Sequence, residues 1–172
     1  MPSSTLATDV AHIIDRELRA LRRELEAYPD ERHLWQPLPG VGNSAGTLAL
    51  HLAGNLQHYF GACFGGTGYV RNREAEFGRR DVSRAELIAE VERAREAVRA
   101  GAARLDQAAV DGEFPERVAE AHLRTGDYLV HLCVHLAYHL GQIDMHRRVV
   151  TGDARGIGAV RPVELRSARP DG

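Results

Sequence analysis

The sequence predicts an all-α fold, a four-helix bundle, and two observations support this prediction. Four segments place apolar residues at the spacing of an amphipathic helix, and no segment shows the apolar–polar alternation of a strand. The chain has 172 residues, of which 44% are hydrophobic and 27% are charged, so it is long enough to bury one complete core. We therefore expect one helical domain over residues 1–150 and a C-terminal tail over residues 151–172.

Capping residues and helix breakers delimit the four helices. A Pro-Asp pair ends the first helix, Asn43 or Ser44 opens the second, and a Gly-Gly-Thr-Gly run stops it. The Ser-Arg-Ala-Glu stretch that begins at Ser83 is a capping box for the third helix. Thr125 is expected to cap the fourth helix, and Gly152 to stop it. The helices expected on these grounds cover residues 5–28, 44–64, 83–105 and 125–150.

Three segments without a helical period connect these helices. Residues 31–43 contain prolines and glycines and are expected to form a loop. Residues 69–82 carry both charge signs and no clear period, which predicts an extended loop. Residues 109–124, with Gly112 and Pro115, are expected to form the third connection.

The most informative feature is a run of three histidines, His131, His135 and His139, inside the apolar fourth helix. Residues four apart lie on one helix face, so either neighbouring pair of this run could bind one metal ion. His131 and His139 are about 12 Å apart along the axis and cannot share an ion directly. His51 or His58 of the second helix could supply a third ligand. These two are about 10.5 Å apart, so only one of them can join the same site.

Three imidazoles would leave one coordination position of a metal open, as catalytic sites require. Zinc, nickel and iron all suit imidazole ligands, so the residues do not select among them. No glutamate follows the first histidine of either pair, and the general base of an H-E-x-x-H metalloprotease is therefore missing. The histidines expected at the surface, because they lie among polar neighbours or near helix ends, are His12, His33, His122 and His146.

Composition excludes several other classes of function. All 22 basic residues are arginine, so Schiff-base chemistry and a covalently held pyridoxal cofactor are excluded. The net charge of −2 gives no overall attraction to nucleic acid, and no apolar stretch of about 18 residues predicts a membrane span. Cys63 and Cys133 form no C-x-x-C pair, and no secretory signal opens the chain. We therefore expect a reducing, cytoplasmic location.

Several of these residues occur in an order that resembles the DinB-like (YfiT-like) superfamily. The matching stretches are Asn-Ser at residues 43–44, Leu-His-Leu-Ala-Gly-Asn at residues 50–55, and His-x-x-x-His-x-Gly-Gln-Ile at residues 135–143. An uncharacterised branch of the superfamily also has a Phe-Gly-Gly turn and an Arg-x-Arg-x-x-Glu-Phe stretch. Residues 64–66 and 71–77 resemble these two features.

The resemblance covers roughly residues 5–150 and implies a four-helix bundle with a long crossover connection. It implies a divalent metal held by one histidine of the second helix and two of the fourth, which are His51, His135 and His139 in this sequence. Members of the superfamily often pair, so the resemblance also implies a homodimer.

Polar residues around these histidines could complete the site. Arg71 and Arg73 lie on the expected loop and could bind an acidic group of a substrate if this loop folds over the histidines. A solvated, charged loop is the alternative interpretation. The residues expected to support the metal ligands or the substrate, without binding the metal themselves, are Asn55, Gln142, His131 and His58.

Function is predicted from the same resemblance. Relatives in the superfamily use a metal to activate a low-molecular-weight thiol, such as bacillithiol or mycothiol, for transfer to an electrophile. We therefore expect a metal-dependent thiol S-transferase that acts on a small molecule. The alternatives are a metal-dependent hydrolase and a non-catalytic metal- or ligand-binding stress protein, because a fold and a metal do not fix the chemistry.

Overall fold

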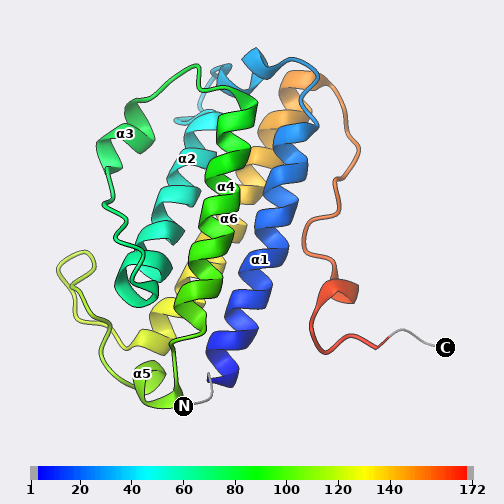
Figure 1. Ribbon diagram of the computed structural model, residues 1–172. Coiled ribbons are helices and arrows are strands. Elements are labelled where there is room, and N and C mark those ends of the chain that lie inside the picture. The colour runs from blue at the N-terminus through cyan, green and yellow to red at the C-terminus, as the bar shows by residue number, and fades with distance from the viewer. Residues whose placement is uncertain (1–3, 170–172) are drawn as a thin grey trace.

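The structure, a computed structural model that describes residues 4–169, confirms the all-α fold. Four long helices lie side by side as a bundle (Figure 1), and the described residues contain two isolated β-bridges but no strand. The second long helix continues directly into a π-helix, η2. The elements of the bundle are α1 (Thr5–Glu26), α2 (Ala45–Leu56), η2 (Gln57–Gly65), α4 (Arg84–Ala102) and α6 (Thr125–Thr151).

The connection between η2 and α4 is the predicted long crossover. In Figure 1, α1 and α6 run upwards, whereas α2 and α4 run downwards. After η2 the chain must therefore return along the length of the bundle before it can enter α4. The returning segment carries α3 (Arg73–Gly78). The remaining short elements are η1 (Glu31–Trp35), α5 (Gln107–Asp111) and η3 (Pro162–Glu164).

The prediction of an extended loop over residues 69–82 is wrong, because α3 forms within this segment. Asn72 caps α3, and its Oδ1 accepts a hydrogen bond from the N–H of Ala75 at 2.9 Å. Gly54 of α2 has no side chain, and a Cβ atom there would collide with the carboxylate of Glu76. The glycine therefore allows α3 to lie directly on α2. A helix of six residues is too short to show a helical period in the sequence.

The helix ends agree with the sequence at three caps and differ at one. The Oγ atoms of Ser44 and Ser83 each accept a hydrogen bond from the backbone N–H three residues later, at 3.3 and 3.2 Å. Gly152 ends α6 with a φ of 70°, which glycine adopts without strain. The expected cap at Thr125 is wrong, because Thr125 is already helical and the preceding Arg124 makes no side-chain cap bond.

A buried ion pair joins α1 to α6 inside the apolar core. Arg147 of α6 is fully buried, and its Nε donates to Oε2 of the buried Glu24 at 2.5 Å. The other guanidinium nitrogens of Arg147 donate to the carbonyl oxygens of Asp153 and Arg155 at 3.1 and 2.7 Å. The first residues of the expected tail, which follows α6, therefore lie against the bundle.

One of the four histidines expected at the surface is buried, so that expectation is wrong for His146. Its side chain contacts the segment that joins α1 to α2, and the residue is 3% exposed. Its Nε2 lies 2.8 Å from the carbonyl oxygen of Gln36, and its Nδ1 lies 2.8 Å from the hydroxyl of Tyr28. Because a carbonyl can only accept, Nε2 carries the proton and Nδ1 accepts from the tyrosine.

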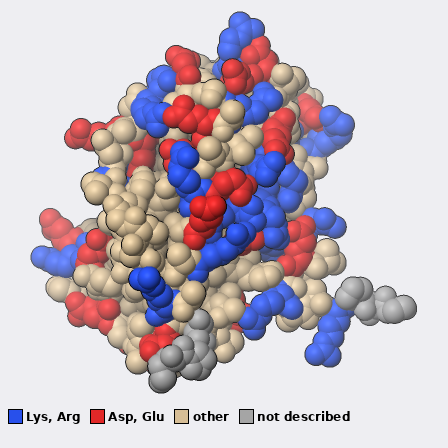
Figure 2. Space-filling model, viewed as in Figure 1, with Lys and Arg blue, Asp and Glu red and all other residues tan. Residues whose placement is uncertain are grey.

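Charged side chains of both signs gather on the upper and right parts of the face that Figure 2 shows. Among the ion pairs of the surface, Asp15 of α1 pairs with Arg19, Arg95 and Arg99 at 2.7, 2.9 and 3.1 Å. Surface ion pairs contribute only about 0–1 kcal/mol each to folding stability. The packing of α1 on α4 therefore depends mainly on the buried apolar residues of the two helices. Among the described helices, none is long and apolar enough to cross a membrane.

Candidate metal centre

Three histidines from two antiparallel helices come together near the middle of the bundle. His51 lies on α2, and His135 and His139 lie one turn apart on α6. One ring nitrogen of each lies within 4.8 Å of the other two, and His51 Nε2 lies 3.2 Å from His135 Nε2. The three imidazoles therefore form a group that could hold one metal ion.

The environment of the two rings on α6 favours neutral imidazole, which is the form that binds metal. His51 is 5% exposed, while His135 and His139 are half-buried. Burial, followed by repulsion from the neighbouring histidines, lowers the pKa of His135 from 6.5 to about 4. Burial also lowers the pKa of His139. Near neutral pH these two rings therefore keep a free lone pair for a metal ion.

Two hydrogen bonds orient the rings of the group. His51 Nδ1 lies 2.9 Å from Oε2 of Glu76, and His139 Nδ1 lies 2.6 Å from Oε1 of Gln142. Both oxygens accept, so each Nδ1 carries a proton, which leaves each Nε2 as the nitrogen that could bind a metal ion. Metal-binding histidines commonly donate their second N–H in this way to a carboxylate or carbonyl oxygen.

Glu76 is held in place by Arg71 as well as by His51. Arg71 donates from Nε to Oε1 at 2.7 Å and from a terminal nitrogen to Oε2 at 3.0 Å. Burial raises the pKa of Glu76, but the hydrogen bonds from His51 and Arg71 outweigh this effect, and its pKa lies below the ordinary value. The carboxylate therefore stays ionised beside His51.

The two arginines considered as substrate contacts occupy different positions. Arg71 has a side chain that is only 13% exposed, and its guanidinium lies over the ring of Tyr59 while it pairs with Glu76. Arg73 is exposed, and its guanidinium lies 4.9 Å from the ring centre of Phe77, which packs on His51. Arg71 therefore supports the carboxylate, and Arg73 has donors that face solvent near the group.

The other predicted supporting residues are dispersed. Asn55 is buried one helical turn after His51, and its Oδ1 has no hydrogen-bond partner. His131 is exposed and stacks on Tyr128, outside the three-histidine group. His58 lies elsewhere, with its Nε2 at 2.8 Å from Oε1 of Glu116.

Glu76 is the residue that the sequence reasoning missed. It belongs to the Arg-x-Arg-x-x-Glu-Phe stretch, so the sequence contained a signal, but the stretch was expected to form a loop. Its contact with His51 depends on α3 and on the missing side chain of Gly54. Neither feature follows from residue spacing alone.

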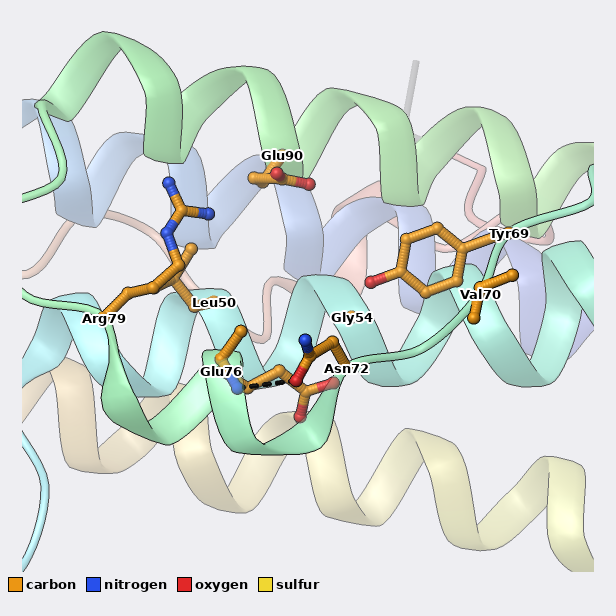
Figure 3. A pocket seen from close by; sticks show the side chains of 9 residues that line it. Leu50, Gly54, Tyr69, Val70, Asn72, Glu76, Arg79 and Glu90 are labelled. Carbon is orange, nitrogen blue, oxygen red and sulfur yellow. Dashed lines mark hydrogen bonds between the residues drawn. The ribbon is translucent and has the colours of Figure 1, made fainter.

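A small pocket lies between α2, α3 and α4, and Glu76 and Gly54 form part of its wall (Figure 3). Tyr69 and Arg79 lie on other sides of the pocket, and its volume is about 140 Å³. Pockets that bind small-molecule ligands usually measure about 300–1,000 Å³. This pocket therefore suits a few water molecules and is too small for a thiol cofactor.

Comparison with known proteins adds one positive finding. The family model described as the DinB superfamily matches residues 13–143, a range that includes all three histidines of the group. No curated protein and no solved structure gave a match to this chain.

We expect His139→Ala to lower the metal content of the purified protein by about one ion per chain, because two imidazoles alone hold a divalent ion weakly. The measurement is elemental mass spectrometry after incubation with zinc, nickel or iron and removal of free metal. His131→Ala is the matched control, since this histidine lies on the same helix outside the group. Equal metal contents in the wild type and His139→Ala would contradict the prediction.

We expect Glu76→Gln to weaken zinc binding about 10- to 100-fold, because the amide keeps an acceptor for His51 but loses the negative charge. Gly54→Ala should act in the same direction by displacing the carboxylate. A competition titration with a chromogenic chelator measures the affinity. Glu74→Gln, at an exposed position of α3, is the control, and an unchanged affinity in Glu76→Gln would disprove the role of the carboxylate.

Proposed function

Because the chain belongs to the DinB superfamily, we propose that the three-histidine group is a divalent-metal centre and that the protein is a metal-dependent thiol S-transferase. The observation that carries the proposal is the group itself. Three imidazoles converge, two of them are oriented by hydrogen bonds, and two are only half-buried. Such a group leaves room for a further ligand from solvent.

The donor set fits a divalent ion such as zinc, nickel or iron. Three neutral ligands leave the charge of such an ion uncompensated, so an anionic fourth ligand is favoured. A divalent ion in this position would lower the pKa of a bound thiol or water molecule. The protein would contribute the orientation of His51 and His139, through Glu76 and Gln142.

Neighbouring residues offer contacts for a thiol and for an electrophile. The exposed guanidinium of Arg73 could bind a carboxylate of the thiol. The unpartnered Oδ1 of Asn55 could accept a hydrogen bond from a bound group. Gln142 also borders a hollow of about 400 Å³, which Met145 and Val149 line as well. The size and the apolar lining of this hollow suit an apolar electrophile.

Thiol transfer fits this group better than hydrolysis does. A hydrolase commonly uses a carboxylate that is free to take a proton from water. Glu76 is the carboxylate in contact with the group, and hydrogen bonds from His51 and Arg71 engage both of its oxygens. A thiol is acidic enough to ionise at a metal without a separate base. Thiol transfer therefore does not need a free carboxylate, and metal-dependent hydrolysis is the second candidate.

The proposed reaction suits the reducing cytoplasm. Cys63 and Cys133 are both free thiols in the structure. Small thiols are held reduced in that compartment, which is where we place the protein.

We expect the zinc-loaded protein to conjugate monochlorobimane to at least one small thiol, and His139→Ala to lose this activity. Fluorescence assays with cysteine, glutathione, bacillithiol and mycothiol test the expectation. His131→Ala is again the control, and chelation should abolish the activity of the wild type.

The alternatives give different outcomes in the same assays. Failure with all four thiols and every metal would refute the transferase. Thiol-independent cleavage of an ester or amide that chelation abolishes would favour the hydrolase. Stable metal binding with neither activity would favour a binding protein.

We also propose that the protein forms a homodimer through an exposed apolar stripe on α6. Val134, Tyr138, Met145 and Val149 of this stripe are each at least 59% exposed, although they recur at helical spacing. Large exposed apolar patches mark interaction sites, and one self-complementary helix face can pair about a twofold axis. The stripe lies beside the histidine face of α6, so a second copy would border the metal centre.

We expect the double substitution Val134→Glu and Tyr138→Glu to convert a dimer into a monomer, because two charges on each copy would be buried without partners. Light scattering coupled to gel filtration measures the mass. Val163→Glu, at an exposed valine outside α6, is the control. A wild-type protein that is monomeric at all concentrations would disprove the dimer.

A further inference from the structure

We propose a second metal site, formed by His58, Cys63 and Glu116, that binds a zinc-type divalent ion. The first two residues lie on η2, and Glu116 lies on the connection between α5 and α6. This site shares no ligand with the three-histidine group and does not depend on the function proposed for that group.

The three side chains already lie within reach of one ion. One ligand atom from each lies within 4.8 Å of the other two, and His58 Nε2 lies 2.8 Å from Glu116 Oε1. All three residues are half-buried. The Nδ1 atom of His58 is buried and has no hydrogen-bond partner, so the ring is not fully satisfied by the protein alone.

The π-helical winding of η2 brings His58 and Cys63 together. In an α-helix, residues five apart point about 140° away from one another. In a π-helix the backbone hydrogen bond joins residues five apart, so such residues stack along one face. π-Helical segments are rare and often occur at functional sites.

Close backbone packing fixes the π-helix against α4. A Cβ atom on Gly101 of α4 would collide with the carbonyl group of Phe60 in η2. A Cβ atom on Gly61 would lie only 2.9 Å from the side chains of Ala97 and Thr67. These glycines allow the two helices to approach closely, and the positions of His58 and Cys63 are therefore set by the backbone.

An aromatic cluster positions the third ligand. Phe114, two residues before Glu116, is 2% exposed and packs against Tyr59, Phe64 and Tyr128 with ring centres 4.7–5.9 Å apart. Its backbone N–H donates to the carbonyl oxygen of Leu123 at 2.8 Å. Glu116 is therefore presented to η2 by an anchored segment of chain.

The donor set selects the class of metal. Thiolate sulfur, imidazole nitrogen and carboxylate oxygen are the three ligand types that zinc uses in proteins. A thiolate from Cys63 and a carboxylate from Glu116 would together neutralise the charge of a divalent ion. The ion would displace the proton of the Cys63 thiol, which passes to solvent, and no oxidation or reduction is involved.

Cobalt(II) provides a direct test, because a cobalt–thiolate bond gives a charge-transfer band in the near ultraviolet. The full-length protein is titrated with cobalt in a His139→Ala background, which weakens the three-histidine group. We expect the band in this variant and also after the further change Cys133→Ser, which alters the other cysteine. We expect its loss after Cys63→Ser, and at least tenfold weaker cobalt binding after Glu116→Gln.

Two outcomes would overturn the proposal. One is the absence of a thiolate band at saturating cobalt in the His139→Ala protein. The other is a band that survives Cys63→Ser. Circular dichroism of each variant checks folding, and the partly exposed Glu116 provides a substitution that leaves the core untouched.

Discussion

The hydrogen bond between Glu76 and His51 is the contact on which the architecture of the candidate centre depends. It joins the crossover segment to α2. The bond requires that Gly54 has no side chain, because a Cβ atom there would collide with Glu76. It also depends on Arg71, which donates to the same carboxylate. The same bond fixes which nitrogen of His51 carries a proton. A long connection, which would otherwise only link two parallel helices, thereby orients one of the three imidazoles.

Much of the fold follows from the sequence, because long helices with strong caps are local features. The caps at Ser44 and Ser83 and the stop at Gly152 depend on neighbouring residues only. The spacing of the histidines along the fourth helix showed which pairs could bind one metal ion. It did not show whether His51 or His58 supplies the third ligand. That choice rested on the resemblance to the superfamily, and the structure places His51 with His135 and His139.

The features that could not be predicted depend on contacts between distant segments. His146 is buried because Tyr28 and the carbonyl of Gln36 satisfy both of its nitrogens. The six residues of α3 are stabilised by their contact with α2, not by a period of their own. The π-helical winding of η2 could not be predicted either, because the pattern of its apolar residues also fits the period of an α-helix. A spacing of five residues therefore gave no reason to expect Cys63 beside His58, and the π-helix brings the two together.

The π-helix has an evolutionary consequence. Its hydrogen-bonded ring holds one residue more than that of an α-helix, so the loss of a single codon within η2 would restore α-helical winding. A deletion between His58 and Cys63 would leave these residues four apart, on one face of the restored α-helix, whereas His51 lies upstream on α2 and would keep its place opposite α6. One small genetic event could thus change the winding of η2 in a lineage while the three-histidine group is inherited unchanged.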